Sequence, residues 1–73
     1  MSYDLIFRYL DAETGQALTE KAAPVKSLVD CAPCVRAFVL NYDLAASQWI
    51  AGEVFDETGD LISRLAYNGH ELK

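Results

Sequence analysis

Residues 49–67 read WIAGEVFDETGDLISRLAY and predict a β-hairpin. Two runs of alternating, β-favouring residues flank the turn Asp56-Glu57-Thr58-Gly59. Gly59 readily takes the positive φ that a type I turn followed by a G1 bulge requires, and Asp56 can accept hydrogen bonds from backbone N–H groups two residues further on. We therefore expect this turn to set the pairing register of the hairpin.

The predicted register starts from a Phe55–Leu61 pair and continues outward in steps of two residues on each strand. The next pairs are then Glu53–Ser63, Ala51–Leu65 and Trp49–Tyr67. Such cross-strand pairs are the units of sheet stability. One face of the hairpin carries Trp49, Ala51, Phe55, Leu61, Leu65 and Tyr67, and the other carries Ile50, Gly52, Val54, Ile62, Arg64 and Ala66.

Residues 3–10 predict another strand, because aromatic and aliphatic side chains alternate with Asp4 and Arg8. The turn that follows, at residues 11–16, contains the same Glu-Thr-Gly sequence as the turn after Phe55. We expect a second hairpin with similar turn chemistry, which returns through residues 17–19. The aromatic and aliphatic face of the first strand consists of Tyr3, Leu5, Phe7 and Tyr9.

Residues 19–32 predict a helix of two to three turns. Thr19 suits the N-cap, and Pro24 suits an early helical position. Val25, Leu28, Val29 and Ala32 recur at i, i+3, i+4 and i+7 and form one apolar stripe. Pro33 disfavours helical backbone at the preceding residue and is expected to end the helix.

Residues 34–43 fit two patterns. As a strand they place apolar side chains on both faces, which is typical of a central strand. As a helix they place Cys34, Val35, Phe38, Val39 and Tyr42 on one stripe. The β-rich composition favours the strand. The tail after Asn68-Gly69 begins with a turn signal and is expected to fray.

Together these elements predict the order β-β-α-β-β-β within one small domain, residues 1–73. The fold class is α+β: an antiparallel sheet of four to five strands with one short helix packed on one face. A chain of 73 residues buries only about 60% of the surface that it exposes when unfolded. Surface left exposed in so small a chain favours a dimer or a protein partner.

The sharpest chemical motif is Cys31-Ala32-Pro33-Cys34. It resembles the redox motif of thioredoxin-fold proteins, in which such a run opens a helix whose N-terminus lowers the pKa of the first thiol. The resemblance is confined to the motif, and it implies a redox-active pair. Two thiolates are also half of a structural zinc ligand set, which a second chain would complete. The simpler expectation is that Cys31 ends the helix, Cys34 packs in the core and both thiols are free.

Acidic and aromatic residues supply candidate interaction sites. Four carboxylates fall within eight residues, at Glu53, Asp56, Glu57 and Asp60, without the ligand spacing of an EF-hand. They can present negative charge to a basic protein, in one acidic rim with the turn at residues 11–13. Phe7, Phe38 and Phe55 are expected in the core. Apolar area left exposed near Tyr42, Trp49 and Tyr67 suits protein binding.

Charge narrows the classes of partner. Eleven acidic against six basic side chains give a net charge of −5, which disfavours direct nucleic acid binding. Asp4 and Arg8 interrupt the apolar N-terminal run, so we expect no signal peptide, no membrane association and a cytoplasmic protein. No pattern indicates an enzyme, a cofactor or a complete metal site.

These observations favour a small, acidic, non-enzymatic protein-binding module, an adaptor or inhibitor, that works through an exposed sheet face or edge. Its partner is another protein or a second copy of the chain. One version of the hypothesis is a mobile-element protein that occupies a basic surface of a nucleic-acid-handling complex. The alternative is a thiol redox or metal-binding protein that uses Cys31 and Cys34.

Overall fold

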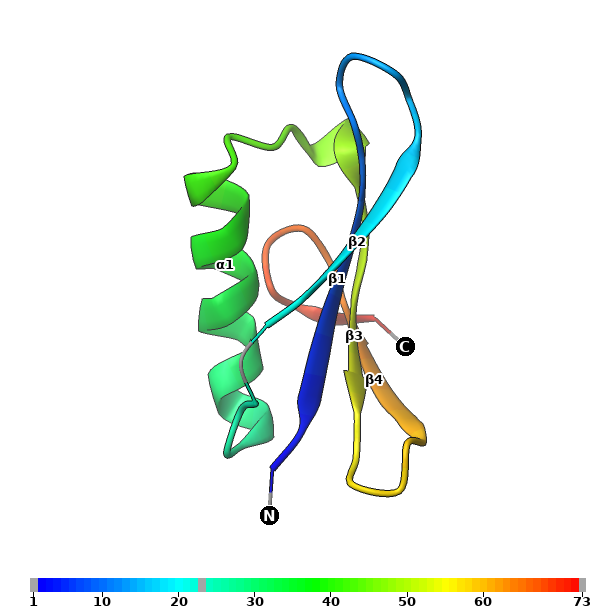
Figure 1. The fold of residues 1–73 in the computed structure, drawn as a ribbon. Coiled ribbons are helices and arrows are strands. Elements are labelled where there is room, and N and C mark those ends of the chain that lie inside the picture. The colour runs from blue at the N-terminus through cyan, green and yellow to red at the C-terminus, as the bar shows by residue number, and fades with distance from the viewer. Residues whose placement is uncertain (1, 23, 73) are drawn as a thin grey trace.

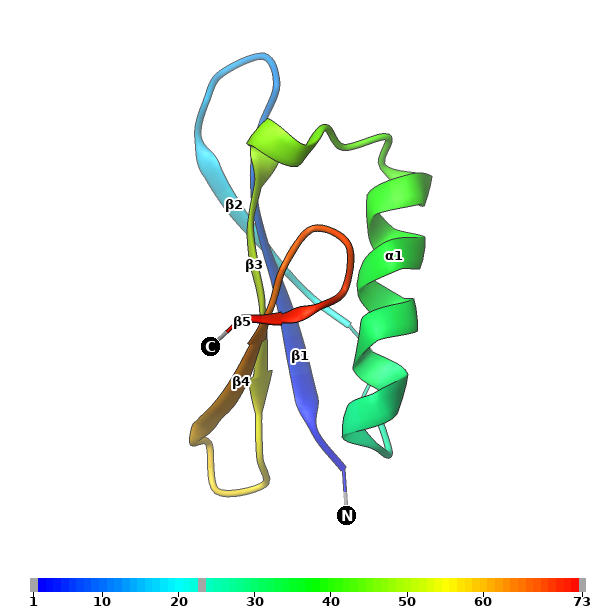
Figure 2. The same ribbon diagram turned by 180° about the vertical axis from the view of Figure 1, so that it is seen from behind.

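The computed structural model describes residues 2–22 and 24–72. Five strands form one antiparallel sheet in the order β2-β1-β3-β4-β5. A single α-helix lies along one face of this sheet, and the opposite face is uncovered (Figures 1 and 2). The predicted α+β fold is therefore confirmed. The elements are β1 (Asp4–Leu10), β2 (Ala17–Lys21), the 3-10 turn η1 (Leu28–Asp30), α1 (Cys31–Asn41), the 3-10 turn η2 (Ala46–Gln48), β3 (Trp49–Phe55), β4 (Leu61–Leu65) and β5 (Glu71–Leu72).

The helix occupies the segment for which a strand was favoured, and the helix predicted at residues 19–32 is wrong. Thr19 lies in β2, and Pro33 is the third residue of α1 rather than a stop signal. Proline is tolerated there because a first-turn N–H has no intrahelical acceptor in any case. Val35, Phe38 and Val39 are buried, which confirms the helical alternative for this segment. Apolar side chains on both sides of the helix give the same sequence pattern as a central strand, which is why the pattern favoured a strand.

The β3–β4 hairpin and its turn are confirmed. Gly59 has φ +89°, and Asp56 accepts hydrogen bonds from the backbone N–H groups of Thr58 (2.9 Å) and Asp60 (3.0 Å). The Asp56 N–H in turn donates to the Asp60 carbonyl at 3.0 Å. These bonds join residues at most four apart, which explains why local sequence predicts the turn.

The predicted register of this hairpin is correct only at its first pair. An irregularity between Val54 and Phe55 leaves Ile62 as an extra residue in β4. A β-bulge of this kind moves every later pair by one residue and exchanges the faces of one strand relative to the other. Ala51 and Leu65 therefore lie on opposite faces. The observed pairs are Phe55–Leu61, Val54–Ser63, Glu53–Arg64 and Gly52–Leu65.

The other two turns differ in how well they were predicted. The β1–β2 hairpin is confirmed, with Gly15 at φ +72°, and β2 extends to Lys21. The tail does not fray: it forms β5 after a third turn, in which the Ala66 N–H donates to the His70 carbonyl at 2.7 Å. This turn rests on α1, which a local pattern cannot reveal.

Gly69 and Gly59 form a matched pair for testing this contact. Both have φ +89°, but a Cβ on Gly69 would lie 3.0 Å from the Arg36 guanidinium and 3.1 Å from the Ala32 carbonyl oxygen, whereas a Cβ on Gly59 would meet nothing within 4 Å. We expect Gly59→Ala to cost about 1–2 kcal/mol from backbone strain alone. Gly69→Ala should cost roughly 1–3 kcal/mol more, because the turn must also move off the helix. Urea unfolding of both variants measures the difference, and equal losses would contradict the contact.

The hydrophobic core lies between α1 and the sheet. Leu5, Val35 and Val54 are fully buried at its centre. Gly52 allows α1 to pack closely on β3, since a Cβ there would lie 3.0 Å from Val35 Cγ2. At the C-terminal end of α1 the rings of Phe7, Tyr9, Phe38, Tyr42 and Trp49 form an aromatic cluster.

Candidate functional site

The uncovered face of the sheet is a mixed surface of apolar and charged side chains. One row of neighbours crosses all five strands. On the same face the guanidinium of Arg8 forms an ion pair with Glu53, and the Lys21 ammonium lies 3.7 Å from the Asp4 carboxylate. Strand pairing and these ion pairs give the face a defined shape. The row consists of Lys21, Ile6, Glu53, Arg64 and Leu72.

The acidic turn after β3 is internally hydrogen-bonded. The Asp56 carboxylate accepts hydrogen bonds from the Thr58 hydroxyl and from the N–H groups of Thr58 and Asp60. These bonds hold the pKa of Asp56 below its ordinary value, the Thr58 hydroxyl contributing most. The Glu57 carboxylate accepts the Ser2 N–H at 3.1 Å. The turn therefore presents its negative charge in a fixed arrangement.

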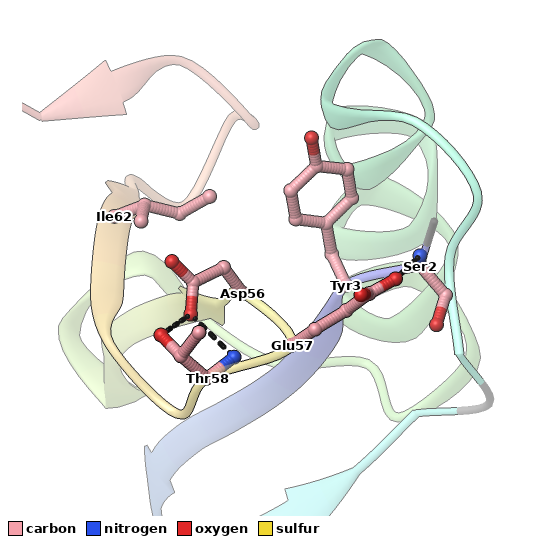
Figure 3. Close-up of a pocket in the computed structure, with 6 residues that line it drawn as sticks. All are labelled: Ser2, Tyr3, Asp56, Glu57, Thr58 and Ile62. Atoms are coloured by element: carbon pink, nitrogen blue, oxygen red, sulfur yellow. Dashed lines mark hydrogen bonds between the residues drawn. The ribbon is translucent and has the colours of Figure 1, made fainter.

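A shallow hollow of about 300 Å³ lies beside this turn. Figure 3 shows the Tyr3 ring and the Ile62 side chain on opposite sides of it, with Asp56 between them. The hollow is open, and its carboxylates are already engaged by Thr58, Asp60 and Ser2. It extends the surface around the turn.

The two acidic turns do not form one rim. The turn between β1 and β2 carries Asp11 and Glu13, and it lies at the opposite end of the sheet from the turn between β3 and β4 (Figures 1 and 2). Because β1 and β3 run antiparallel, the turn that follows β1 and the turn that follows β3 lie at opposite ends of the sheet. The negative charge is consequently divided between the two ends of the molecule.

The pH dependence of stability is expected to report the hydrogen bonds of Asp56. A lowered folded-state pKa means that Asp56 adds stability above the ordinary aspartate pKa, and that this stability is lost as pH falls through the lowered value. Asp56→Asn should flatten the acid limb of the stability curve below about pH 4. Chemical unfolding at several pH values tests this. The control is Asp30→Asn, because the Asp30 side chain makes no capping hydrogen bond; a similar flattening there would contradict the assignment.

The three aromatic candidates differ in exposure. Trp49 Nε1 donates to the Leu65 carbonyl at 3.1 Å, and the Tyr67 hydroxyl donates to the Leu44 carbonyl at 2.8 Å. Both side chains are half-buried against the core. Tyr42 is 49% exposed and its hydroxyl donates to Glu20 at 3.0 Å, a bond that raises the pKa of Tyr42. Tyr42 is thus the most exposed of the three.

The cysteine pair opens α1, so the expectation that Cys31 ends a helix is wrong. Cys31 is buried, with Sγ 3.8 Å from the Ser27 carbonyl oxygen, and Cys34 is half-buried at the edge of the core. Burial raises the pKa of Cys31, and the neighbouring Cys34 and Asp30 raise it further. A raised pKa reduces the thiolate fraction at neutral pH and so opposes nucleophilic chemistry. Within residues 2–22 and 24–72, no group of three or more His, Cys, Asp or Glu side chains could hold a metal ion.

Alkylation rates should separate the two thiols. A Cys34→Ser chain retains only the Cys31 thiol, and a Cys31→Ser chain retains only the Cys34 thiol. In folded protein at pH 7 we expect Cys31 to react at least about tenfold more slowly than Cys34, because attack on the buried Cys31 requires local opening. Mass spectrometry after timed iodoacetamide treatment gives both rates. Unfolding in urea should bring the two rates together. Faster reaction at Cys31 would instead indicate an activated thiol.

Sequence reasoning missed the outer face of the segment formed by η1 and α1. Val29 is 75% exposed and Leu40 is 80% exposed, the two highest values among the exposed large hydrophobic residues of the described chain. Val29 had been assigned to a core-facing stripe. A helical interpretation of residues 28–41 as a whole gives the signal, because the segment is apolar except at Asp30, Arg36 and Asn41, and helices that are apolar on nearly all sides are usually buried.

Comparisons with known proteins return no relatives. No family model, curated protein or solved structure matches this chain. Among the helices of the described residues, none has the length and apolar character needed to cross a membrane.

Proposed function

We propose that this chain is a small, non-enzymatic protein-binding module, an adaptor or inhibitor, that contacts its partner with the uncovered face of the sheet. One observation carries the proposal: a row of paired residues crosses all five strands, and no helix or strand within residues 2–22 and 24–72 covers that face of the sheet (Figure 2). The row mixes apolar Ile6 and Leu72 with charged Glu53 and Arg64. Interfaces that form and dissociate have this mixed composition.

The charge distribution favours a partner with basic groups around a less polar centre. Asp11 and Glu13 lie at one end of the sheet, and Asp56, Glu57 and Asp60 lie at the other. Opposite potentials on two proteins speed their encounter and select against wrong partners. A basic surface that normally holds nucleic acid has such groups in abundance. In its concrete form, the proposal is that the chain blocks such a surface in a nucleic-acid-handling complex. This role suits a protein that is encoded by a mobile element.

Variants on the two sides of the molecule test the proposed surface. Tagged wild-type chain is used to capture partners, which are identified by quantitative mass spectrometry and then titrated as purified proteins. Leu72→Lys and Glu53→Lys add positive charge to the uncovered face, and we expect each to weaken binding to a basic partner about tenfold or more. The matched control is Leu40→Lys on the outside of α1, which should bind as wild type does.

Salt gives a second readout. Binding to a basic partner should weaken as ionic strength rises, because the acidic turns are exposed and salt screens them. A partner that is lost with Leu40→Lys but retained with Leu72→Lys and Glu53→Lys would place the interface on the wrong side and overturn the proposal. Binding that ignores both salt and all three substitutions would do the same.

A thiol redox role is the second candidate, and one observation favours it: Cys31-Ala32-Pro33-Cys34 stands at the N-terminus of α1. The raised pKa of Cys31 weighs against it. Measured thiol pKa values and elemental analysis of purified protein distinguish this candidate from a binding module. Two thiols with unperturbed or raised pKa and no bound metal would rule the candidate out.

A further inference from the structure

The strand β2 forms one edge of the sheet, since β1 is its only neighbour among the described strands. The Asp11 N–H donates to the Gln16 carbonyl, and the Ala22 N–H donates to the Leu5 carbonyl. Hydrogen-bonded and non-hydrogen-bonded positions alternate along an antiparallel pair. The even-numbered residues of β2 therefore bond to β1, whereas the N–H and C=O groups of the odd-numbered residues point outward. The outward residues are Ala17, Thr19 and Lys21.

These outward backbone groups define the kind of chain that can bind at this edge. Within residues 2–22 and 24–72 they have no hydrogen-bond partner. Donors and acceptors repeated at every second residue match an extended polypeptide, which would add a sixth strand to the sheet. The opposite edge, β5, spans only Glu71–Leu72 and is a much shorter template. Backbone pairing fixes the geometry, so the side chains of β2 must select the partner.

Two side chains of β2 lie on the helix side of the sheet. They are Leu18 and Glu20, because the residues paired with them, Tyr9 and Phe7, pack in the core. Toward a new strand these two positions are the non-hydrogen-bonded ones, where opposite side chains come closest. The exposed Leu18 suits an apolar side chain opposite it. Glu20 sets the charge of the other one.

The Glu20 carboxylate has a hydrogen-bond donor for only one of its two oxygens. Oε1 accepts a hydrogen bond from the Tyr42 hydroxyl at 3.0 Å. Oε2 is shielded from water and has no donor in the part of the chain that the structure describes, which is an unfavourable state for a carboxylate oxygen. Burial raises the pKa of Tyr9, and the charges of Glu20 and Asp11 raise it further, so the potential at this corner is negative. A cationic donor satisfies both conditions.

We propose that β2 binds an extended basic segment of a partner protein as a sixth strand, with an arginine or lysine side chain opposite Glu20. The segment runs antiparallel to β2, as do all the strand pairs of the sheet. The last torsion of a glutamate side chain turns readily, so the arriving cation can engage either carboxylate oxygen in a charge-assisted hydrogen bond. It can also lie on the ring of Tyr42, which is half exposed.

The register defines a short recognition pattern. In an antiparallel pair, the residue opposite Leu18 lies two positions after the residue opposite Glu20. The preferred segment is therefore a basic residue, any residue and an apolar residue in extended conformation. Lys21 does not repel the basic residue at close range, because it projects from the other face of β2 and its ammonium lies 3.7 Å from the Asp4 carboxylate.

A second copy of this chain matches the edge less well. The register that uses all the outward residues of both copies pairs Thr19 with Thr19 about a twofold axis. Glu20 of each copy then faces Leu18 of the other, and neither carboxylate gains a cation. Charge complementarity thus favours a basic segment of another protein.

This inference does not rest on the proposed function, because the edge of β2 and the uncovered face are different surfaces. Leu72→Lys changes the uncovered face at β5, on the far side of the sheet from β2. It should leave binding at the edge unchanged. Failure of one proposal can therefore be distinguished from failure of the other.

Titration of the full chain with a fluorescent seven-residue peptide tests the edge. The third residue of the peptide is arginine, the fifth is leucine, and the others are threonine and valine. We expect a Kd of roughly 10–500 µM. Replacing the arginine by norleucine should weaken binding about fivefold or more, because the charge-assisted bond to Glu20 is lost. No binding of the arginine peptide, or equal binding of the norleucine peptide, overturns the proposal.

Backbone methylation of the peptide tests strand addition with a matched control. Methylating the nitrogen of the fourth residue, which faces Thr19, should abolish binding because it removes a hydrogen bond of the new strand. Methylating the nitrogen of the fifth residue, which points away from β2, should weaken binding far less. Equal losses would show that the peptide does not bind as a strand.

A charge-matched pair of protein variants tests the role of Glu20. Glu20→Gln should abolish the preference for the arginine peptide over the norleucine peptide. Glu13→Gln removes the same charge from the turn before β2 and should keep that preference. Circular dichroism shows whether each variant is folded, and the peptide comparisons on wild-type protein stand without either variant. A preference that survives in folded Glu20→Gln overturns the assignment.

Amide chemical shifts show where the peptide binds. On saturation, the N–H signals of the three outward residues of β2 should move more than those of Leu18 and Glu20, which already bond to β1. Shifts that leave the outward residues unchanged contradict the proposal. A Thr19 signal that moves with protein concentration in the peptide-free chain would identify a second copy as the occupant and overturn it as well.

Discussion

Phe38→Ala is expected to remove a large share of the folding free energy of this protein. The Phe38 ring stacks on the rings of Phe7 and Tyr42, with centroid distances of 4.1 Å and 4.3 Å. The Tyr9 ring packs against Phe38 in a T-shaped arrangement, with centroids 5.3 Å apart. Truncating a buried phenylalanine costs about 3–5 kcal/mol. A chain of this length is stable by only roughly 4–11 kcal/mol. One substitution can therefore remove most of the folding free energy.

The matched control is Phe55→Ala, which makes the same chemical change outside the core. Phe55 is half-buried and lies on the uncovered face of the sheet, where it pairs with Asp4. We expect it to cost about 1–2 kcal/mol, since less area returns to water. Fluorescence of the single Trp49, whose ring centroid is 6.3 Å from that of Phe38, follows urea unfolding of both variants. Similar losses in the two would show that the aromatic cluster is not the centre of stability.

Gly52→Val should also destabilise the protein strongly. An added Cβ would already lie 3.0 Å from Val35 Cγ2 and 3.4 Å from the Trp49 ring, and valine adds two methyl groups beyond it. The helix must then move away from β3, at a cost of about 3 kcal/mol. Gly52→Ala should cost much less, because the alanine recovers about 0.5–1 kcal/mol from the entropy that glycine loses on folding.

A double-substitution cycle isolates the contact. Combining Gly52→Ala with Val35→Ala removes the methyl group that the new Cβ meets, so the loss in the double variant should be smaller than the two single losses together by about 1 kcal/mol. Denaturant unfolding of the four proteins gives the coupling free energy. Additive losses would show that Val35 does not pack tightly on Gly52.

The helix shows why sequence patterns alone mislead here. Residues 34–43 alternate well enough for a strand, and Pro33 resembles a stop signal. In the folded chain Pro33 stands in the first turn of α1, and Phe38 finds Phe7 and Tyr42 as ring partners. Tyr42 lies about one helical turn further along the same segment, but Phe7 belongs to the distant strand β1. A window of ten residues contains no information about which distant aromatic side chains will be available.

The candidate surfaces were predictable to different degrees. The charged residues of the turn after β3 were identified as a group, since they are neighbours in sequence. Their position relative to Asp11 and Glu13 was not predictable, because it depends on strand order and direction. The exposed outer face of η1 and α1 was missed, because a predicted helix displaced by about a dozen residues assigned Val29 to the core.

Local chemistry accounts for the turns of this protein. Asp56, Thr58 and Gly59 complete their hydrogen bonds and their positive φ within five residues, so no distant part of the chain is needed to specify the hairpin. The position of the helix, the extra residue in β4 and the choice of the bare sheet face depend on packing between segments far apart in sequence. Burial of Val35 and Phe38 against β1 and β3 outweighs the weak local preference of residues 34–43 for a strand.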